Sequence, residues 1–245
     1  MKRYDLTDIG TVYRLEAGDS TTPVEALLYD ATRPVAFDTE TSGTDVYAAD
    51  FRLRLCQFGT TDEAYVWEPK DFPDLARLVT TTRAVWYWNA EFDTRVLAQC
   101  AGIPLHETWA YVWDAQILSR LVDPRGVKDG GIGHTMDAQA EERLGLSVKG
   151  EAKAAMMEAG RAYKLRSQAA VWAGIPTDDE TYVRYAGQDV MLTSRLGPDL
   201  LAEIEALDMV DVANKQFAVA YCYADVVHRG WKIDRPYAEE AIRKY

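Results

Sequence analysis

The chain has 245 residues, 48% of them hydrophobic and 27% charged, which is ordinary for a soluble globular protein with a substantial apolar core. No apolar stretch reaches the roughly 18 residues that cross a bilayer, and the N-terminus has no signal-peptide core. The three cysteines lack C-x-x-C spacing. We therefore expect a cytoplasmic protein with no membrane partner. The net charge of −12 argues against a phosphate-rich partner, unless the acids hold divalent cations that meet the phosphate.

The first half of the sequence alternates strand-like and helix-like segments. Short apolar or alternating runs predict strands, and apolar residues at helical spacing predict helices. The predicted strands are 11–15, 34–40, 52–59, 63–69, 83–89 and 108–114, and the predicted helices are 21–30, 71–81, 91–102 and 115–122. The intervening TTD joins the third and fourth strands in a hairpin. Strands separated by helical crossovers indicate an α/β sheet with at least one parallel pair.

The second half of the sequence changes character. A glycine-rich loop at 123–133 is followed by three helix-like segments at 135–145, 150–174 and 177–207. No internal repeat, low-complexity tract or flexible linker interrupts them, which favours one domain up to about residue 207.

The stretch PVAFDTETSG ends an apolar run with Asp38 and Glu40, which have one residue between them. Side chains two apart on a strand share a face, so the two carboxylates lie together. A solvated strand end is the simple interpretation of such a pair. Val35, Ala36 and Phe37 favour a buried strand instead, where close carboxylates are costly unless they are protonated or neutralised by a cation.

A second polar group, NAEFD, places Asn89 and Asp93 at a strand-to-helix transition. In an ordinary helix N-terminus, Asn89 would be the N-cap residue, and the negative charge of Glu91 would be favoured by the positive end of the helix dipole. This interpretation explains Asp93 less well, because the adjacent Phe92 is expected to face the core.

A third group, YAGQD, places Tyr185 and Asp189 four residues apart on one face of a helix. A surface Tyr–Asp pair is the alternative interpretation. Gly187 between them costs a helix roughly 1 kcal/mol against alanine, which suggests that another group approaches closely there.

Taken together, the order and spacing of these segments resemble the three motifs of the DEDD 3′–5′ exonucleases, in their tyrosine variety. The matching residues are Asp38 and Glu40 for the first motif, Asn89, Phe92 and Asp93 for the second, and Tyr185 and Asp189 for the third. The resemblance implies a ribonuclease H-like α/β fold, with a mixed five-stranded sheet flanked by helices and a helical C-terminal half.

The resemblance also implies a two-metal hydrolysis with Mg²⁺ or Mn²⁺. Asp38 is expected to bridge both ions, Glu40 and Asp189 to complete the tighter site, and Asp93 to act through the water shell of the second ion. All-carboxylate ligands suit such hard cations, and the sequence offers no Cys/His constellation for zinc. Tyr185, with an ordinary pKa of about 10, is expected to orient the attacking water with Glu40 rather than to serve as the base.

Histidine-type relatives use a histidine near the tyrosine, and His106, His134 and His228 do not match that position. These three residues are expected to be structural or at the surface.

Substrate contacts follow less directly from the sequence. Thr41, Asn89 and Phe92 are expected to contact the terminal nucleotide. A basic stretch either tracks phosphates or forms a solvated helix face; it comprises Lys149, Lys153, Arg161, Lys164 and Arg166. Tyr163 and Trp172 could stack on bases, although core packing also explains Trp172.

The C-terminal stretch AYCYADVVHRGWKIDRPYAEEAIRKY resembles the junction between proofreading domain and thumb in family A DNA polymerases. It implies an exonuclease domain at 1–207 and a helical start of a thumb-like segment at 208–245. The implied enzyme is a 3′–5′ exodeoxyribonuclease that proofreads single-stranded DNA 3′ ends for a polymerase domain in cis or in trans, in a bacterial or phage-infected cell.

Two alternatives stay open. A ribonuclease D-like or Werner-type exonuclease would use the same metals on RNA or structured DNA. A non-catalytic scaffold would keep the fold, but the four acids and the tyrosine are all intact here.

Residues 210–226 carry two apolar stripes at helical spacing. One stripe is Ala213, Phe217, Tyr221 and Ala224, and the other is Val212, Val219, Tyr223 and Val226. A helix that is apolar on two sides is expected to be buried on both, and one side can pack on the exonuclease domain. The other side would then mediate self-association or binding of a polymerase fragment through residues 210–245.

Overall fold

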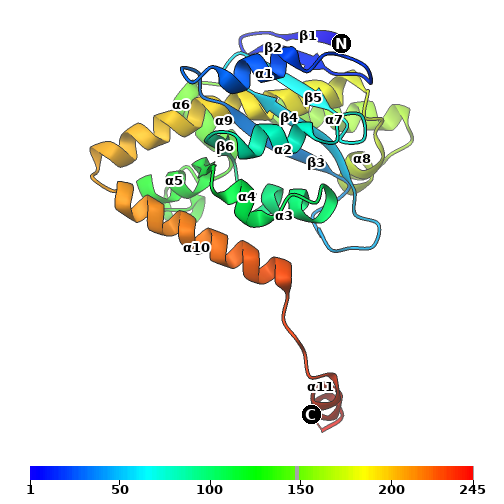
Figure 1. Cartoon of the computed structure of the whole chain (residues 1–245), viewed down its shortest axis with the longest axis vertical. Helices are drawn as coiled ribbons and strands as arrows, with labels where there is room; N and C mark the ends of the chain where they lie inside the picture. The colour runs from blue at the N-terminus through cyan, green and yellow to red at the C-terminus, as the bar shows by residue number, and fades with distance from the viewer. Residues whose placement is uncertain (147–148, 245) are drawn as a thin grey trace.

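The computed structural model describes residues 1–146 and 149–244. Its strands are β1 (Lys2–Leu6), β2 (Gly10–Arg14), β3 (Ala36–Thr41), β4 (Leu53–Gly59), β5 (Glu63–Trp67), β6 (Val85–Tyr87) and β7 (Val112–Asp114). They form one mixed sheet in the order β1-β2-β5-β4-β3-β6-β7 (Figure 1). The central pairs β3–β4 and β4–β5 are antiparallel, whereas β3–β6, β6–β7 and β2–β5 are parallel.

The expected α/β class and the β4–β5 hairpin are confirmed, but the expected number of five strands is wrong. Strands β5, β4, β3, β6 and β7 form a five-stranded sheet, and the antiparallel β1–β2 pair extends it along β5 to seven strands in the described part of the chain. The first strand, KRYDL, is mostly exposed at the sheet edge. An edge strand needs no continuous apolar run, so the sequence of β1 carries little strand signal.

Eleven α-helices and one 3-10 turn surround the sheet in the described residues. They are α1 (Thr22–Tyr29), α2 (Leu75–Thr81), α3 (Ala90–Cys100), α4 (Leu105–Trp109), α5 (Ala115–Val122), α6 (Met136–Leu144), α7 (Lys149–Ala162), α8 (Gln168–Gly174), α9 (Glu180–Ala206), α10 (Val210–Arg229), α11 (Arg235–Lys244) and the turn Val127–Asp129.

The helices bury the two faces of the sheet in two separate apolar cores. One core joins the sheet to residues of α1, α2 and α3, and the other joins it to residues of α5 to α9. Strand β3 contributes to both, because Phe37 belongs to the first core and Ala36 to the second. The same alternation sends Asp38 and Glu40 toward the α9 side of the sheet.

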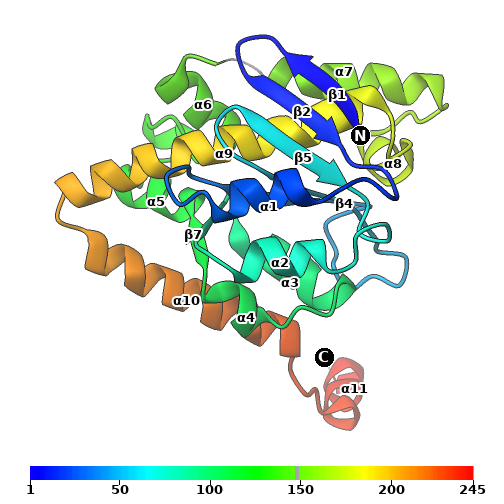
Figure 2. The ribbon, with the colours of Figure 1, turned by 45° about the horizontal axis from the view of Figure 1, so that its top comes forward.

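Helix α9 crosses the sheet at unusually short range because two glycines face the strands (Figure 2). A Cβ atom at Gly187 would lie 2.5 Å from a methyl group of Val12 in β2, and one at Gly197 would lie 2.3 Å from the indole of Trp86 in β6. The close approach expected at Gly187 is therefore made by the sheet itself.

Two predicted elements are divided in the structure. The predicted helix 150–174 is wrong in extent, because α7 ends at Ala162 and α8 begins at Gln168. Between them Lys164 adopts a left-handed conformation with φ of 62°, and the side chain of Leu165 packs against Gly174. The predicted strand 108–114 is also wrong in its first residues, which form the end of α4.

Helix α10 carries the two stripes as expected. Ala213 and Ala224 are buried, and Phe217 contacts Trp113 edge-on with ring centroids 6.0 Å apart. The second stripe of α10, comprising Val212, Val219, Tyr223 and Val226, is exposed. Helix α11 stands away from the sheet and its residues are exposed (Figure 1). Within the described residues, no helix combines the length and the apolar character that a membrane span requires.

We expect Gly197→Ala to destabilise the fold although alanine favours a helix by about 1 kcal/mol. The added methyl group meets the Trp86 indole, and overpacking of this kind costs about 1–3 kcal/mol. Urea denaturation measures the change in the free energy of unfolding. Gly126→Ala is the matched control, since its nearest neighbour would lie at an ordinary 3.6 Å. Equal stability of the two variants would contradict the close packing of α9.

Candidate active site

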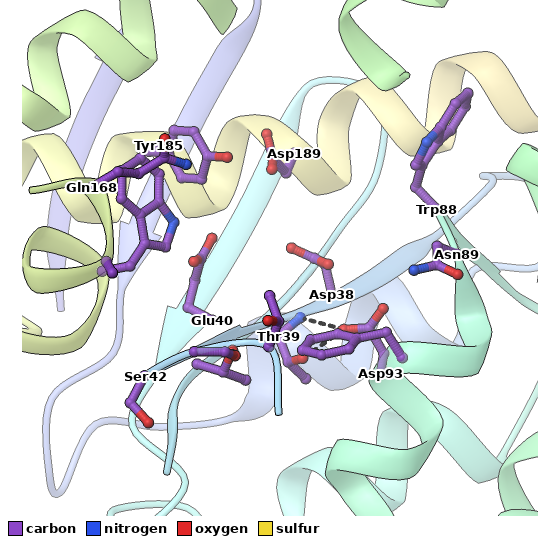
Figure 3. A pocket seen from close by; sticks show the side chains of 16 residues that line it. Asp38, Thr39, Glu40, Ser42, Trp88, Asn89, Asp93, Gln168, Tyr185 and Asp189 are labelled. Atoms are coloured by element: carbon purple, nitrogen blue, oxygen red, sulfur yellow. Dashed lines mark hydrogen bonds between the residues drawn. The ribbon is translucent and has the colours of Figure 1, made fainter. Parts of the chain in front are cut away.

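A cavity of about 590 Å³ opens at the end of β3. Four segments form its walls: β3 with the following loop to Thr44, the start of α3, the start and middle of α8, and the first half of α9. Figure 3 shows side chains of all four segments around this cavity. The three segments that resemble exonuclease motifs therefore meet in one place.

Three carboxylates converge at the centre of the cavity. Asp38 and Glu40 project from the same face of β3, and Asp189 projects toward them from α9 (Figure 3). Each offers one oxygen, and these oxygens lie within 4.8 Å of one another. Glu40 and Asp189 are buried. Like charges at this range are stabilised by a cation, and three carboxylate oxygens are ligands that suit Mg²⁺ or Mn²⁺.

A buried glutamine holds one of these carboxylates. Gln57 lies opposite Asp38 in the β3–β4 register, and its amide donates a 2.6 Å hydrogen bond to Asp38 Oδ2. Gln57 has no exposed surface. Gln57 lies outside the three motifs and was not predicted, although a single amide within the apolar run LCQFG is a signal for it. Its bond orients the Asp38 carboxylate relative to the strand.

Asp93 lines the same cavity but is not among the three clustered carboxylates. Its Oδ1 accepts hydrogen bonds from the Thr39 backbone N–H at 3.0 Å and from the Thr39 hydroxyl at 2.5 Å (Figure 3). Burial, followed by the neighbouring charge of Asp38, raises the pKa of the Asp93 carboxyl well above its usual value. Asp93 thus ties the start of α3 to β3, and its expected role toward a second ion stays a prediction.

The start of α3 is capped from elsewhere in the chain. Asn89 adopts a left-handed conformation with φ of 71°, and its side chain makes no capping hydrogen bond, so the cap interpretation of Asn89 is wrong. The Asp114 carboxylate instead accepts from the backbone N–H of Ala90 at 2.8 Å, and from those of Gln116 and Ile117 at 2.9 and 3.1 Å. One buried acid therefore caps α3 and α5 together, and the Asn89 side chain lines the cavity.

Tyr185 lies one helical turn before Asp189 and points into the cavity (Figure 3). Its ring meets the Trp172 ring edge-on, with centroids 5.7 Å apart and an interplanar angle of 88°. The negative charge of Asp189, together with burial and the charge of Glu40, raises the pKa of Tyr185 well above its usual value. The hydroxyl group therefore keeps its proton at neutral pH and can donate a hydrogen bond.

The other residues expected to contact the terminal nucleotide also line the cavity, together with residues that were not expected there. Thr41 and Phe92 line the cavity, and the Thr41 hydroxyl donates a 2.7 Å hydrogen bond to the Gly43 carbonyl. Gln168 of α8 and Trp88 also line it and were missed, because short polar or aromatic signals outside the motifs are not specific. Trp172 lines the cavity as well, so it is not simply a core residue.

The basic stretch and the histidines lie outside this cavity. None of the basic residues with described side chains lines it, Arg161 pairs with Glu158, and the side chain of Lys149 falls outside the described residues. The Tyr163 hydroxyl donates to Asp179 at 2.9 Å. Of the histidines, His134 lies 3.3 Å from the Ser119 hydroxyl and His228 lies 3.3 Å from the Tyr47 hydroxyl, away from the carboxylates.

Comparison with known proteins places these features in a family. Residues 19–205 match the family described as 3′-5′ exonuclease. The DNA polymerases of Mycobacterium phages D29 and L5 are each 32% identical over 217 residues, 86% of this chain. Those residues are 35% and 36% of the two polymerases, so the chain spans about a third of the length of these curated relatives.

Solved structures support the same fold at lower identity. Brucella melitensis NrnC, solved with bound Mg²⁺ and also bound to pGG, is 22% identical, with a TM-score of 0.62 over 91% of this chain and 95% of that chain. Escherichia coli RNase D, an exoribonuclease, is 19% identical, with a TM-score of 0.63 over 87% of this chain and 50% of that chain. These likenesses confirm the expected ribonuclease H-like fold. Since the family match covers residues 19–205, most of the chain, and includes all of the clustered acids, the chain belongs to the 3′–5′ exonuclease family.

Proposed function

We propose that the chain removes nucleotides from the 3′ ends of single-stranded DNA and proofreads for a family A DNA polymerase domain, in cis or in trans. The observation that carries this proposal is the convergence of Asp38, Glu40 and Asp189 within 4.8 Å, beside Tyr185. The identity of 32% to two phage DNA polymerases supports DNA as the substrate. In the proposed division, residues 1–207 form the exonuclease domain and 208–245 begin a thumb-like segment.

The proposed chemistry uses two Mg²⁺ or Mn²⁺ ions, for which the clustered carboxylates are suitable ligands. Such ions supply an activated water molecule and neutralise the charge that develops on the leaving 3′ oxygen. Asp38, Glu40 and Asp189 would hold them, and Gln57 would keep the Asp38 carboxylate in one orientation. Asp93, tied to Thr39, would act through coordinated water.

Tyr185 and the cavity walls would position the substrate. The protonated Tyr185 hydroxyl can donate to the attacking water or to a phosphate oxygen, and Trp172 supports its ring. Thr41, Phe92 and Asn89 would contact the terminal nucleotide, since all three line the cavity around the carboxylates.

RNA is the second candidate substrate. RNase D, a structural neighbour, is an exoribonuclease, and NrnC is solved bound to pGG. The likeness to these proteins establishes the fold, and the choice between the two polymers depends on experiment.

We expect single-stranded DNA to be cleaved from its 3′ end with Mg²⁺ or Mn²⁺, and at least about ten-fold faster than RNA by kcat/KM, which corresponds to about 1.4 kcal/mol. The assay compares 5′-labelled DNA and RNA decanucleotides of one sequence. EDTA should abolish cleavage, and Ca²⁺ should support binding with little turnover. Release from 5′ ends, or strong activity in EDTA, would contradict the proposal; faster cleavage of RNA would assign the second candidate.

We expect Asp38→Asn to reduce kcat by about three orders of magnitude, because it removes a shared metal ligand worth several kcal/mol to the transition state. The fold should be retained or stabilised by about 1 kcal/mol in EDTA, since one of three close negative charges is lost. Single-turnover kinetics and urea denaturation measure the two effects. Asp50→Asn, at an exposed position in the loop after β3, is the control. A normal rate in Asp38→Asn would show that the carboxylates do not hold the catalytic metals.

We expect Tyr185→Phe to be milder, with a loss of about 10- to 100-fold in kcat, as for a lost hydrogen bond. Because Tyr185 is expected to orient the attacking water rather than to serve as the base, the rise of kcat with pH should be unchanged in the variant. The measurement is a pH–rate profile of both proteins. If the variant lost the alkaline rise, or fell as far as Asp38→Asn, Tyr185 would be acting as the base instead.

A further inference from the structure

A second cavity, of about 390 Å³, adjoins the candidate active site on the side of α5 and α10. We call it the second hollow. The start of α3, the exposed side of α5 and the middle of α10 form its walls, and α10 contacts both α3 and α5. Asn89 lines both cavities, so the two are separated only by this residue and its neighbours. The two cavities therefore adjoin at Asn89.

The second hollow offers a flat aromatic surface. Tyr223 and Val219 are 59% and 61% exposed, and both belong to the second stripe of α10. Ile117 and Leu121 of α5 line the opposite wall. An accessible tyrosine ring beside aliphatic side chains is suited to stacking of a nucleobase, which is largely independent of base identity.

The charges around the second hollow favour a phosphate. Arg120 is exposed at its wall, where its guanidinium lies 3.5 Å from the Gln116 side-chain oxygen. Two acids also line the second hollow. Glu91 is compensated by Arg95 at 2.8 Å, and the Asp114 carboxylate is occupied by backbone N–H groups at the starts of α3 and α5. Lys215 lies one helical turn before Val219, on the same face of α10.

We propose that the second hollow binds single-stranded DNA upstream of the nucleotide being removed. A base would stack on Tyr223, and Arg120 would contact a phosphate of the same strand. Asn89, whose left-handed backbone is held by Asp114, would contact the strand between the two cavities. This inference rests on the proposed function and extends it, because it assigns a path to the part of the strand that is not cleaved.

The occupant is assigned to nucleic acid because the second hollow continues the candidate active site and carries cationic and aromatic groups together. A second copy of the chain would bring an acidic surface to Arg120, but it would not use the continuity through Asn89. In this proposal the exposed second stripe of α10 binds the substrate, while the first stripe packs on the domain.

The test measures binding of labelled di-, penta- and octadeoxynucleotides in Ca²⁺ by fluorescence anisotropy. Tyr223→Ala should weaken binding of the two longer strands about ten-fold and leave the dinucleotide unchanged, because the short ligand ends in the active cavity. Arg120→Ala should lower the magnitude of the slope of log Kd against log salt by about 0.7, the value for one phosphate contact on a single strand. Both side chains are exposed, so neither change disturbs the core.

Tyr29→Ala and Arg3→Ala are the matched controls, since both side chains are exposed and belong to α1 and β1, outside both cavities. The inference is overturned if the variants match these controls, or if all strand lengths are weakened equally. It is also overturned if Tyr223→Ala abolishes self-association in sedimentation while strand affinity is unchanged, which would assign the second hollow to a second copy. Failure of the unchanged chain to cleave DNA or RNA would instead reject the proposed function.

Discussion

The site depends on how closely α9 lies against the sheet. Asp38 and Glu40 are brought together by the pleat of one strand, but Asp189 reaches them only because its helix rests on the strands through Gly187 and Gly197. Without a cation, each of these acids raises the free energy of the folded state through repulsion of the others. The packing energy of a 27-residue helix against a continuous apolar core is the stabilising term that offsets this repulsion. The site is therefore a strained arrangement of charges held by an ordinary core.

Alternate side chains of β3 point to opposite faces of the sheet, so this one strand contributes functional residues to both faces. Phe37 and Thr39 face the α3 side, where Thr39 binds Asp93, and Asp38 and Glu40 face the α9 side. A shift of one residue in the β3–β4 register would exchange these sets and separate the acids. Gln57 opposite Asp38 adds a polar reason for the register, because the buried Gln57 amide has the Asp38 carboxylate as its acceptor in this pairing.

Features that are local in sequence could be predicted, and features that depend on distant pairing could not. The apolar run that ends in Asp38 and Glu40 predicted β3, and the helical spacing at 177–207 predicted α9; the motifs within them identified the clustered acids. Asp114 was read as the end of a strand, because a carboxylate that caps two helices is recognisable only after α3 and α5 are placed beside each other. The break between α7 and α8 depends on a left-handed turn at Lys164, a residue type with no preference for that conformation.

The double cap at Asp114 has a consequence for how this domain can vary. One carboxylate satisfies backbone donors of two helices, and one of those helices begins directly after Asn89, the residue that lines both cavities. A change at this position would release donors at both helix starts at once, so compensation by a single second substitution is difficult. A residue that only contacts the substrate, in contrast, can be replaced without a compensating change elsewhere in the fold. Asp114 lies outside the active cavity and lines the second hollow, yet its loss would disturb both helix starts whether or not it contacts the substrate.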